Sequence, residues 1–246
     1  MINTDRGIMP VWVSGASYQL VAVDGADVNA PTTIDDRSVL VPAAGRADLA
    51  VQIPKNGRAV RVDIAGAGLI IGPDGATASA TRAPSETVDL RVTDHHRFRP
   101  CCTDSDLRLQ DWPPARVRER EAGVFWTING HLFPNVGMFM VAEGDIVRMR
   151  ISNHSGQAHP MHLHGHHVLV LARDGVQSTG SPWWTDSLEV KTGQTYEVAF
   201  RADNPGLWMD RCHNLVHAKQ GLVAHLMYQG VTTPFRLGRH TANYPE

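Results

Sequence analysis

The stretch IVRMRI, residues 146–151, alternates apolar and charged residues. Val147, Met149 and Ile151 fall on one side of this pattern and the two arginines on the other, as in a half-buried β-strand. The stretch YEVAFR, residues 196–201, repeats the same period of two. Both stretches therefore predict strands with one face in a core and the other toward solvent.

Short apolar runs in the first half of the chain also predict strands. They cover residues 11–14, 18–23, 38–41, 47–53 and 59–64. Turn signals such as Ser14-Gly15, Asp24-Gly25 and Asn56-Gly57 separate them. Almost no stretch shows a helical period, so the spacing predicts an all-β chain of antiparallel sandwiches or barrels.

The strand pattern breaks down between about residues 93 and 123, where WPP at 112–114 and a charged run at 116–121 indicate a connecting segment. We therefore predict a first β unit over residues 1–92, a connector over 93–123, a second unit over 124–231 and a tail over 232–246. The first unit is short for a full sandwich. We expect strands that it lacks to be replaced by a symmetric neighbour or its edges to be left open, and a homodimer is the simplest such arrangement.

Composition excludes several classes of protein. The net charge of −2 over 246 residues gives no electrostatic reason to expect nucleic acid or an anionic membrane as partner. No apolar run approaches the roughly 20 residues that span a bilayer, and the first residues do not form a signal peptide. Three cysteines are too few for a disulfide framework. Thirteen histidines are more unusual, and six of them lie between positions 154 and 167.

Two segments carry metal-ligand chemistry: HPMHLHGH, residues 159–166, and CHNLVH, residues 212–217. His162 and His164 are two apart on a predicted strand, so both imidazoles can face one site. Cys212 and His213 are adjacent and face opposite sides, so one strand can serve two metal sites. Two histidines and one thiolate form the ligand set of a blue-copper centre.

Other readings of these segments remain open at this point. The histidine run could bind zinc, and Cys212 could be a buried apolar thiol. Structural zinc, however, recruits four protein ligands in a closed tetrahedron. The joint occurrence of both segments, about fifty residues apart in an all-β chain, favours copper.

The two segments resemble those of the C-terminal domain of multicopper oxidases, the family of laccases and bilirubin-oxidase-like enzymes. Residues 124–228 are similar to the last cupredoxin domain, including TING at 127–130, EGD at 143–145 and NPG at 204–206. Residues 11–72 resemble the later part of the middle domain, through VAVDG at 21–25 and GRAD at 45–48. The resemblance implies cupredoxin-like Greek-key β-sandwiches and bound copper.

The resemblance implies that His159, Cys212 and His217 are the ligands of a type 1 copper. Leu222 stands at the axial position, ten residues after the cysteine. Leucine cannot coordinate, so the centre would be three-coordinate and of high reduction potential. Met227 is the nearest alternative axial donor, although its spacing differs from the family pattern.

The resemblance also implies a trinuclear cluster, to which this chain contributes His162 as type 2 ligand and His164 and His213 as type 3 ligands. Electrons would pass from Cys212 to His213. The reductants implied are small phenols, aromatic amines or low-valent metal ions, with dioxygen as acceptor. The family implies an extracytoplasmic location.

The sequence departs from the family pattern in two places. Arg211 precedes the cysteine where a type 3 histidine is expected, and a guanidinium has no lone pair to offer a metal. Arg211 either occupies the cluster face or points away and pairs with Asp210 on the surface. No HxH-type motif occurs before residue 159, so the remaining cluster ligands are expected from an N-terminal domain or partner.

Three functions follow from these observations. The first is a laccase-like copper oxidoreductase whose type 2/type 3 cluster is incomplete in this chain. The second is a mononuclear blue-copper electron-transfer protein, and the third is an inactive cupredoxin scaffold. Several further residues are interpreted as structural or as flanking the site. These are Trp183, Trp184, Trp208, His166, His167 and His225.

Overall fold

The computed structural model describes residues 1–90, 103–111 and 125–234, with residues 103–111 described by their backbone alone. The chain divides into two compact units. The first contains residues 1–90 and 178–185, and the second contains the other described residues. Among the described residues the only helix is α1 (Leu215–Lys219), so the predicted all-β class is confirmed. No described helix has the length and apolar character needed to span a membrane.

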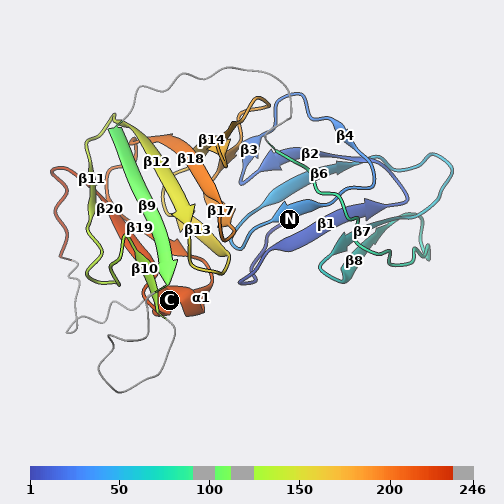
Figure 1. Ribbon diagram of the computed structural model, residues 1–246. Helices are drawn as coiled ribbons and strands as arrows, with labels where there is room; N and C mark the ends of the chain where they lie inside the picture. Colours follow the sequence, from blue (N-terminus) through green and yellow to red (C-terminus); the bar gives the residue numbers. More distant parts are fainter. Residues whose placement is uncertain (91–102, 112–124, 235–246) are drawn as a thin grey trace. The chain divides into compact units, whose positions relative to one another are not determined.

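The first unit is built from two sheets that share one core (Figure 1). One sheet has the order β5 (Val39–Val41), β1 (Met9–Ser14), β7 (Val60–Ile64), β8 (Ala67–Ile71). In the other, β2 (Tyr18–Val23) pairs with β3 (Ala26–Asp27), β4 (Thr33–Ile34) and β6 (Ala47–Val51). Val11 and Val13 of the first sheet pack in the same cluster as Tyr18 and Leu20 of the second. The two sheets therefore form a sandwich. The unit also includes β16 (Trp184–Thr185).

The second unit is also built from two sheets. One has the order β10 (Trp126–Ile128), β9 (Thr103–Asp111), β12 (Ile146–Asn153), β18 (Thr195–Arg201), β14 (Val168–Arg173), β15 (Val176–Gln177). The other has the order β11 (Phe139–Val141), β20 (Val223–Tyr228), β19 (Leu207–Cys212), β13 (His159–Leu163), β17 (Ser187–Val190). Val147, Met149 and Ile151 of β12 are buried and Arg150 is exposed, as the alternation predicted.

The strand β9 lies inside the range that the sequence left as a connector, residues 93–123. It runs parallel to β12 from Thr103 opposite Val147 to Leu109 opposite Asn153, and antiparallel to β10. Its sequence, TDSDLRLQD, has few apolar residues, so its pairing with two neighbours could not be read from hydrophobic alternation. The rest of the predicted connector and residues 235–246 of the predicted tail lie outside the described residues.

Each unit contains a turn built around a buried asparagine, which comes before β1 in the first unit and before β13 in the second. In the second unit, Asn153 Nδ2 donates to the carbonyl oxygens of Gln157 at 2.6 Å and Val190 at 2.7 Å. Its Oδ1 accepts from the Ser155 amide at 2.9 Å.

In the first unit, Asn3 Nδ2 donates to the carbonyls of Gly7 at 2.8 Å and Val41 at 2.9 Å. Its Oδ1 accepts from the Asp5 amide at 2.9 Å. Asn3 and Asn153 are both fully buried. The asparagine makes the same three hydrogen bonds in both turns, and the strand that follows is β1 in the first unit and β13 in the second.

We expect Asn153→Ala to lower the free energy of unfolding by about 1–3 kcal/mol, because the buried Val190 carbonyl oxygen and the partly buried Gln157 carbonyl oxygen lose their donor. Urea unfolding followed by circular dichroism measures the change. Asn135→Ala, at an exposed asparagine of the same unit, is the matched control and should change little. Equal effects of the two substitutions would contradict a structural role for the turn.

Candidate metal centre

Three buried side chains from three neighbouring elements converge in the second unit. His159 is the first residue of β13, Cys212 is the last residue of β19, and His217 lies in α1. β13 and β19 pair antiparallel with Met161 opposite Cys212, which brings the His159 end of one strand beside the cysteine end of the other. Asn214 caps α1 by accepting from the Val216 amide, and the helix returns His217 toward the strands.

The three donor atoms form a small triangle. Cys212 Sγ lies 3.6 Å from His159 Nδ1 and 3.8 Å from His217 Nδ1, and the two nitrogens are 3.0 Å apart. A point in the plane of three atoms at these separations lies about 2.0 Å from each, which is a normal transition-metal bond length to nitrogen. The geometry thus fits a trigonal metal ion with two imidazole ligands and one thiolate.

Burial sets the protonation of this trio. Burial, followed by the neighbouring His217, lowers the pKa of His159 to about 3, and burial also lowers the pKa of His217. Both imidazoles are therefore neutral and have a lone pair for a metal. Burial raises the pKa of the Cys212 thiol to about 12, so metal binding must displace its proton.

Trp126 completes the wall of this centre and was not singled out by the sequence. Its ring lies 4.8 Å from the ring of His159 and 4.8 Å from that of His217, centroid to centroid. The indole Nε1 donates to Gln220 Oε1 at 2.8 Å, and the Trp126 amide donates to the Gln220 carbonyl. The only available signal was its place directly before the TING segment. A tryptophan near a turn does not by itself indicate contact with two ligands.

Leu222 is fully buried beside the trio's backbone: its carbonyl oxygen accepts from the Cys212 amide at 3.1 Å. This bond holds the start of β20 against the end of β19. Met227, the alternative axial donor, lies five residues further on, opposite Met140 and Leu207 in the β20 register. The backbone therefore places Leu222, and not Met227, next to the cysteine.

Three further histidines of the two motifs, His162, His164 and His213, gather in a second group. The ring of His162 lies 4.7 Å from that of His164 and 5.7 Å from that of His213. Asp186 holds His162 Nδ1 through its carbonyl oxygen at 2.8 Å. His164 Nε2 and His213 Nδ1 are buried without a hydrogen-bond partner, which is the state expected of atoms that await a ligand.

Arg211 belongs to this second group. It lies opposite His162 in the β13–β19 register and is 8% exposed. Burial lowers the pKa of His164 to about 4, with smaller contributions from His162 and then from the charge of Arg211. Burial, followed by the charge of Arg211, also lowers the pKa of His213. Asp210 is buried as well, and burial raises its pKa to about 7. The alternative that Arg211 and Asp210 pair on the surface is therefore wrong, because neither side chain is at the surface.

The buried positive charge of Arg211 makes a cluster of metal ions fit this second group poorly. Three imidazoles could supply ligands, whereas the guanidinium offers none and repels a cation. Among the described residues, only His159, Cys212 and His217 have donor atoms close enough together to hold one metal ion, so His162, His164 and His213 form no complete site on this chain's side chains alone.

Two structural interpretations of single histidines are consistent with the structure. His166 is buried, with Nε2 2.6 Å from the Tyr228 hydroxyl and its ring stacked on that of Tyr228. His225 is buried and packs on Phe133. Both rings are used in packing.

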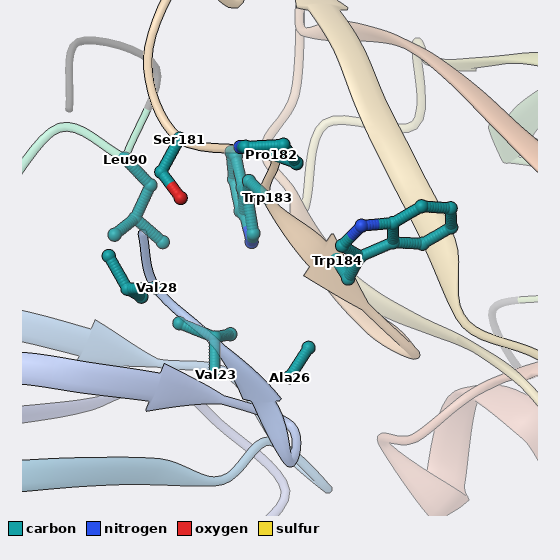
Figure 2. A pocket seen from close by; sticks show the side chains of 8 residues that line it. All are labelled: Val23, Ala26, Val28, Leu90, Ser181, Pro182, Trp183 and Trp184. Atoms are coloured by element: carbon teal, nitrogen blue, oxygen red, sulfur yellow. The ribbon is translucent and has the colours of Figure 1, made fainter. Parts of the chain in front are cut away.

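The first unit contains a small, mostly apolar pocket between the β2–β3 hairpin and residues 181–184. Figure 2 shows Trp183 facing it, together with Val23, Val28 and Leu90. The Ser181 hydroxyl on its rim accepts from the Asn29 amide at 2.8 Å. None of the histidines or the cysteine of the two motifs lines this pocket.

The fold is that of a cupredoxin-type domain, and the buried trio has the donor types, two imidazoles and one thiol, that a blue-copper centre uses. Residues 110–230 match the family model described as multicopper oxidase. This region of the chain, residues 110–230, therefore belongs to the multicopper oxidase family.

Several curated relatives match the chain over part of its length. It is 35% identical over 103 residues to the iron transport multicopper oxidase fio1 of Schizosaccharomyces pombe, covering 37% of this chain and 16% of that protein. It is 34% identical over 103 residues to the multicopper oxidase MmcO of Mycobacterium tuberculosis, covering 42% and 20%. It is 36% identical over 125 residues to Laccase-1 of Botryotinia fuckeliana, covering 48% and 22%. The matched region thus spans about a fifth of the length of these relatives.

Solved structures share the fold over most of the chain. The crystal structure of Fet3p, a multicopper oxidase that functions in iron import, gives a TM-score of 0.73 at 16% identity, over 93% of this chain and 54% of that one. The laccase from Botrytis aclada gives 0.69 at 18% identity, over 91% and 50%. These structures confirm the predicted cupredoxin-like fold.

We expect His159 to destabilise the metal-free fold as pH falls. In the folded protein its pKa is about 3, against 6.5 in an exposed chain, so below about pH 6.5 the unfolded state binds more protons. Asp210 acts in the opposite direction because its pKa is raised, so the comparison of wild type with His159→Gln isolates the histidine. Urea unfolding near pH 7 and near pH 4.5 should show a smaller loss in the variant. Identical losses would contradict a neutral, buried His159.

Proposed function

We propose that the second unit binds one copper ion through His159, Cys212 and His217 and acts in the one-electron oxidation of a substrate by a copper-dependent oxidoreductase. The observation that supports this most directly is the buried triangle of two Nδ1 atoms and one sulfur, with sides of 3.0, 3.6 and 3.8 Å. Copper held by this donor set supplies a one-electron redox couple. Every other part of the proposal concerns what the protein's own residues do.

The protein's first task is to keep the donor set fixed and dry. His159 and Cys212 are fully buried and His217 is nearly so, and Trp126 packs against both imidazoles. Leu222, buried beside Cys212, would offer no donor atom to the metal. Copper held by the two imidazoles and the thiolate in a dry site would then have a high reduction potential.

The second task is to connect the two groups of histidines. Cys212 and His213 are consecutive, so one peptide bond joins the proposed type 1 ligand to the second group. The His213 amide donates to the Pro160 carbonyl at 2.6 Å, which fixes this link to β13. We propose that electrons leave through Cys212 and His213 toward His162 and His164. These two roles make Cys212 and His213 the catalytic residues of the proposal.

The names of the relatives suggest the reductant. They include iron transport oxidases and a laccase. We propose a small reductant of that kind, a low-valent metal ion or a phenolic compound, in an extracytoplasmic location. Dioxygen is the proposed acceptor. Because Arg211 replaces a donor in the second group, we propose that a further domain or partner chain supplies the remaining ligands of the oxygen-reducing cluster.

We expect Cys212→Ser and His159→Gln to abolish the intense blue absorption of a copper–thiolate bond in the oxidised, copper-loaded protein. Visible absorption and copper content per chain measure both effects. His154→Gln is the matched control, because His154 is exposed and close in sequence, and it should retain the colour. A colourless wild type that binds no copper would overturn the proposal.

We expect Leu222→Met to lower the reduction potential, because a thioether in the axial position stabilises the oxidised metal. The exchange conserves volume, so the fold should tolerate it. Redox titration of the blue band measures the shift. Leu226→Met, at a buried leucine of β20, is the control and should leave the potential unchanged. An equal shift in both variants would show that Leu222 is not axial.

A further inference from the structure

We infer that Ser155 is a positioning residue of the metal centre: its hydroxyl fixes the tautomer and ring orientation of His159, so that Nδ1 presents its lone pair to the metal. The inference deepens the proposed function and rests on it only for the identity of the metal. Ser155 Oγ lies 2.6 Å from His159 Nε2, and both side chains are buried.

The direction of this hydrogen bond follows from the neighbours of the hydroxyl. Asn153 Nδ2 donates to two carbonyl oxygens, which fixes the orientation of its amide. Asn153 Oδ1 therefore faces Ser155 as an acceptor, at 2.8 Å from Oγ. The second acceptor near Oγ is the Gln157 carbonyl, at 3.2 Å. The single Ser155 proton is directed to these acceptors, so Oγ must accept from His159.

His159 consequently carries its proton on Nε2. A neutral imidazole has one donor and one acceptor nitrogen, so the lone pair is on Nδ1. Nδ1 is the atom that lies 3.6 Å from Cys212 Sγ and 3.0 Å from His217 Nδ1. The turn around Asn153 therefore sets, before any metal arrives, which nitrogen of His159 faces the other two donors.

The first unit shows that the turn does not itself need this hydroxyl. Its equivalent turn has Asp5 in the place of Ser155 and Met9 in the place of His159. The Asp5 amide makes the same bond to Asn3 Oδ1, while its carboxylate accepts from the Arg6 amide at 2.7 Å. Only the backbone amide at this position is common to both turns. The Ser155 hydroxyl is thus available for the ligand and can be removed without removing the turn.

Removing the hydroxyl has two expected consequences. The buried Nε2–H of His159 loses its acceptor, which is unfavourable in the tautomer that binds the metal. The other tautomer, with its proton on Nδ1, then becomes populated. Partners of this kind around metal ligands typically change metal affinity by about 10–100-fold.

The test compares Ser155→Ala with Ser155→Thr, which keeps a hydroxyl, and with Ser38→Ala, at a buried serine of the first unit. Copper affinity is measured by competition with a chelator. We expect Ser155→Ala to weaken binding by about 10–100-fold, and both Ser155→Thr and Ser38→Ala to stay near wild type. Unchanged affinity in Ser155→Ala would overturn the inference, as would a loss in Ser155→Thr as large as in Ser155→Ala.

A second measurement does not depend on metal binding. The ¹⁵N shifts of the His159 ring in the metal-free protein report which nitrogen carries the proton. We expect the Nε2–H tautomer in wild type and a mixture in Ser155→Ala. An Nδ1–H tautomer in wild type would overturn the inference even if copper binds. If wild type binds no copper but shows the Nε2–H tautomer, the proposed metal fails and the role of Ser155 stands.

Discussion

The antiparallel pairing of β13 with β19 is the constraint on which both groups of histidines depend. Met161 lies opposite Cys212, and His162 lies opposite Arg211. Because neighbouring residues of a strand face opposite sides, this register sends Cys212 to one face of the sheet and Arg211 to the other. A shift of the register by one residue would exchange the two faces and separate Cys212 from His159. The hydrogen bond from the His213 amide to the Pro160 carbonyl oxygen extends this pairing beyond the end of β19, and the Cys212 amide donates to the Leu222 carbonyl oxygen on the other side.

The two histidine-containing motifs could be found in the sequence because their signals are local, whereas the grouping of His159 with Cys212 and His217 was implied by the family resemblance. The alternation in β12 and the spacing of HPMHLHGH and CHNLVH need only a strand period of two to indicate which residues share a face. The supporting residues were not predictable in this way. Trp126 reaches both imidazoles from a different strand, and β9 pairs with two strands although few of its residues are apolar. Such contacts join segments that are far apart in the sequence, so a local pattern does not indicate them.

One missed signal was nevertheless present in the sequence. NTDRGIMP at residues 3–10 and NHSGQAHP at residues 153–160 share the asparagine and the proline at the same spacing. The shared asparagine is explained by its hydrogen bonds, since the side-chain amide of Asn3 donates to the Val41 carbonyl of β5 and that of Asn153 donates to the Val190 carbonyl of β17. Arg211 is the opposite case: its departure from the family pattern is obvious in the sequence, but only its burial shows that the charge stays inside.

The correspondence between the two units extends to the ligands themselves. Val11 of β1 pairs with Ile64 as Met161 of β13 pairs with Cys212, so Met9 and Ile64 stand where the second unit has His159 and Cys212. One backbone frame thus occurs twice in the chain, once with an imidazole and a thiol and once with two apolar side chains. The frame tolerates both, which means that folding and redox chemistry are encoded in different positions. Gain or loss of a metal site on this scaffold is then a matter of a few side chains, with the strand pairing left as it is.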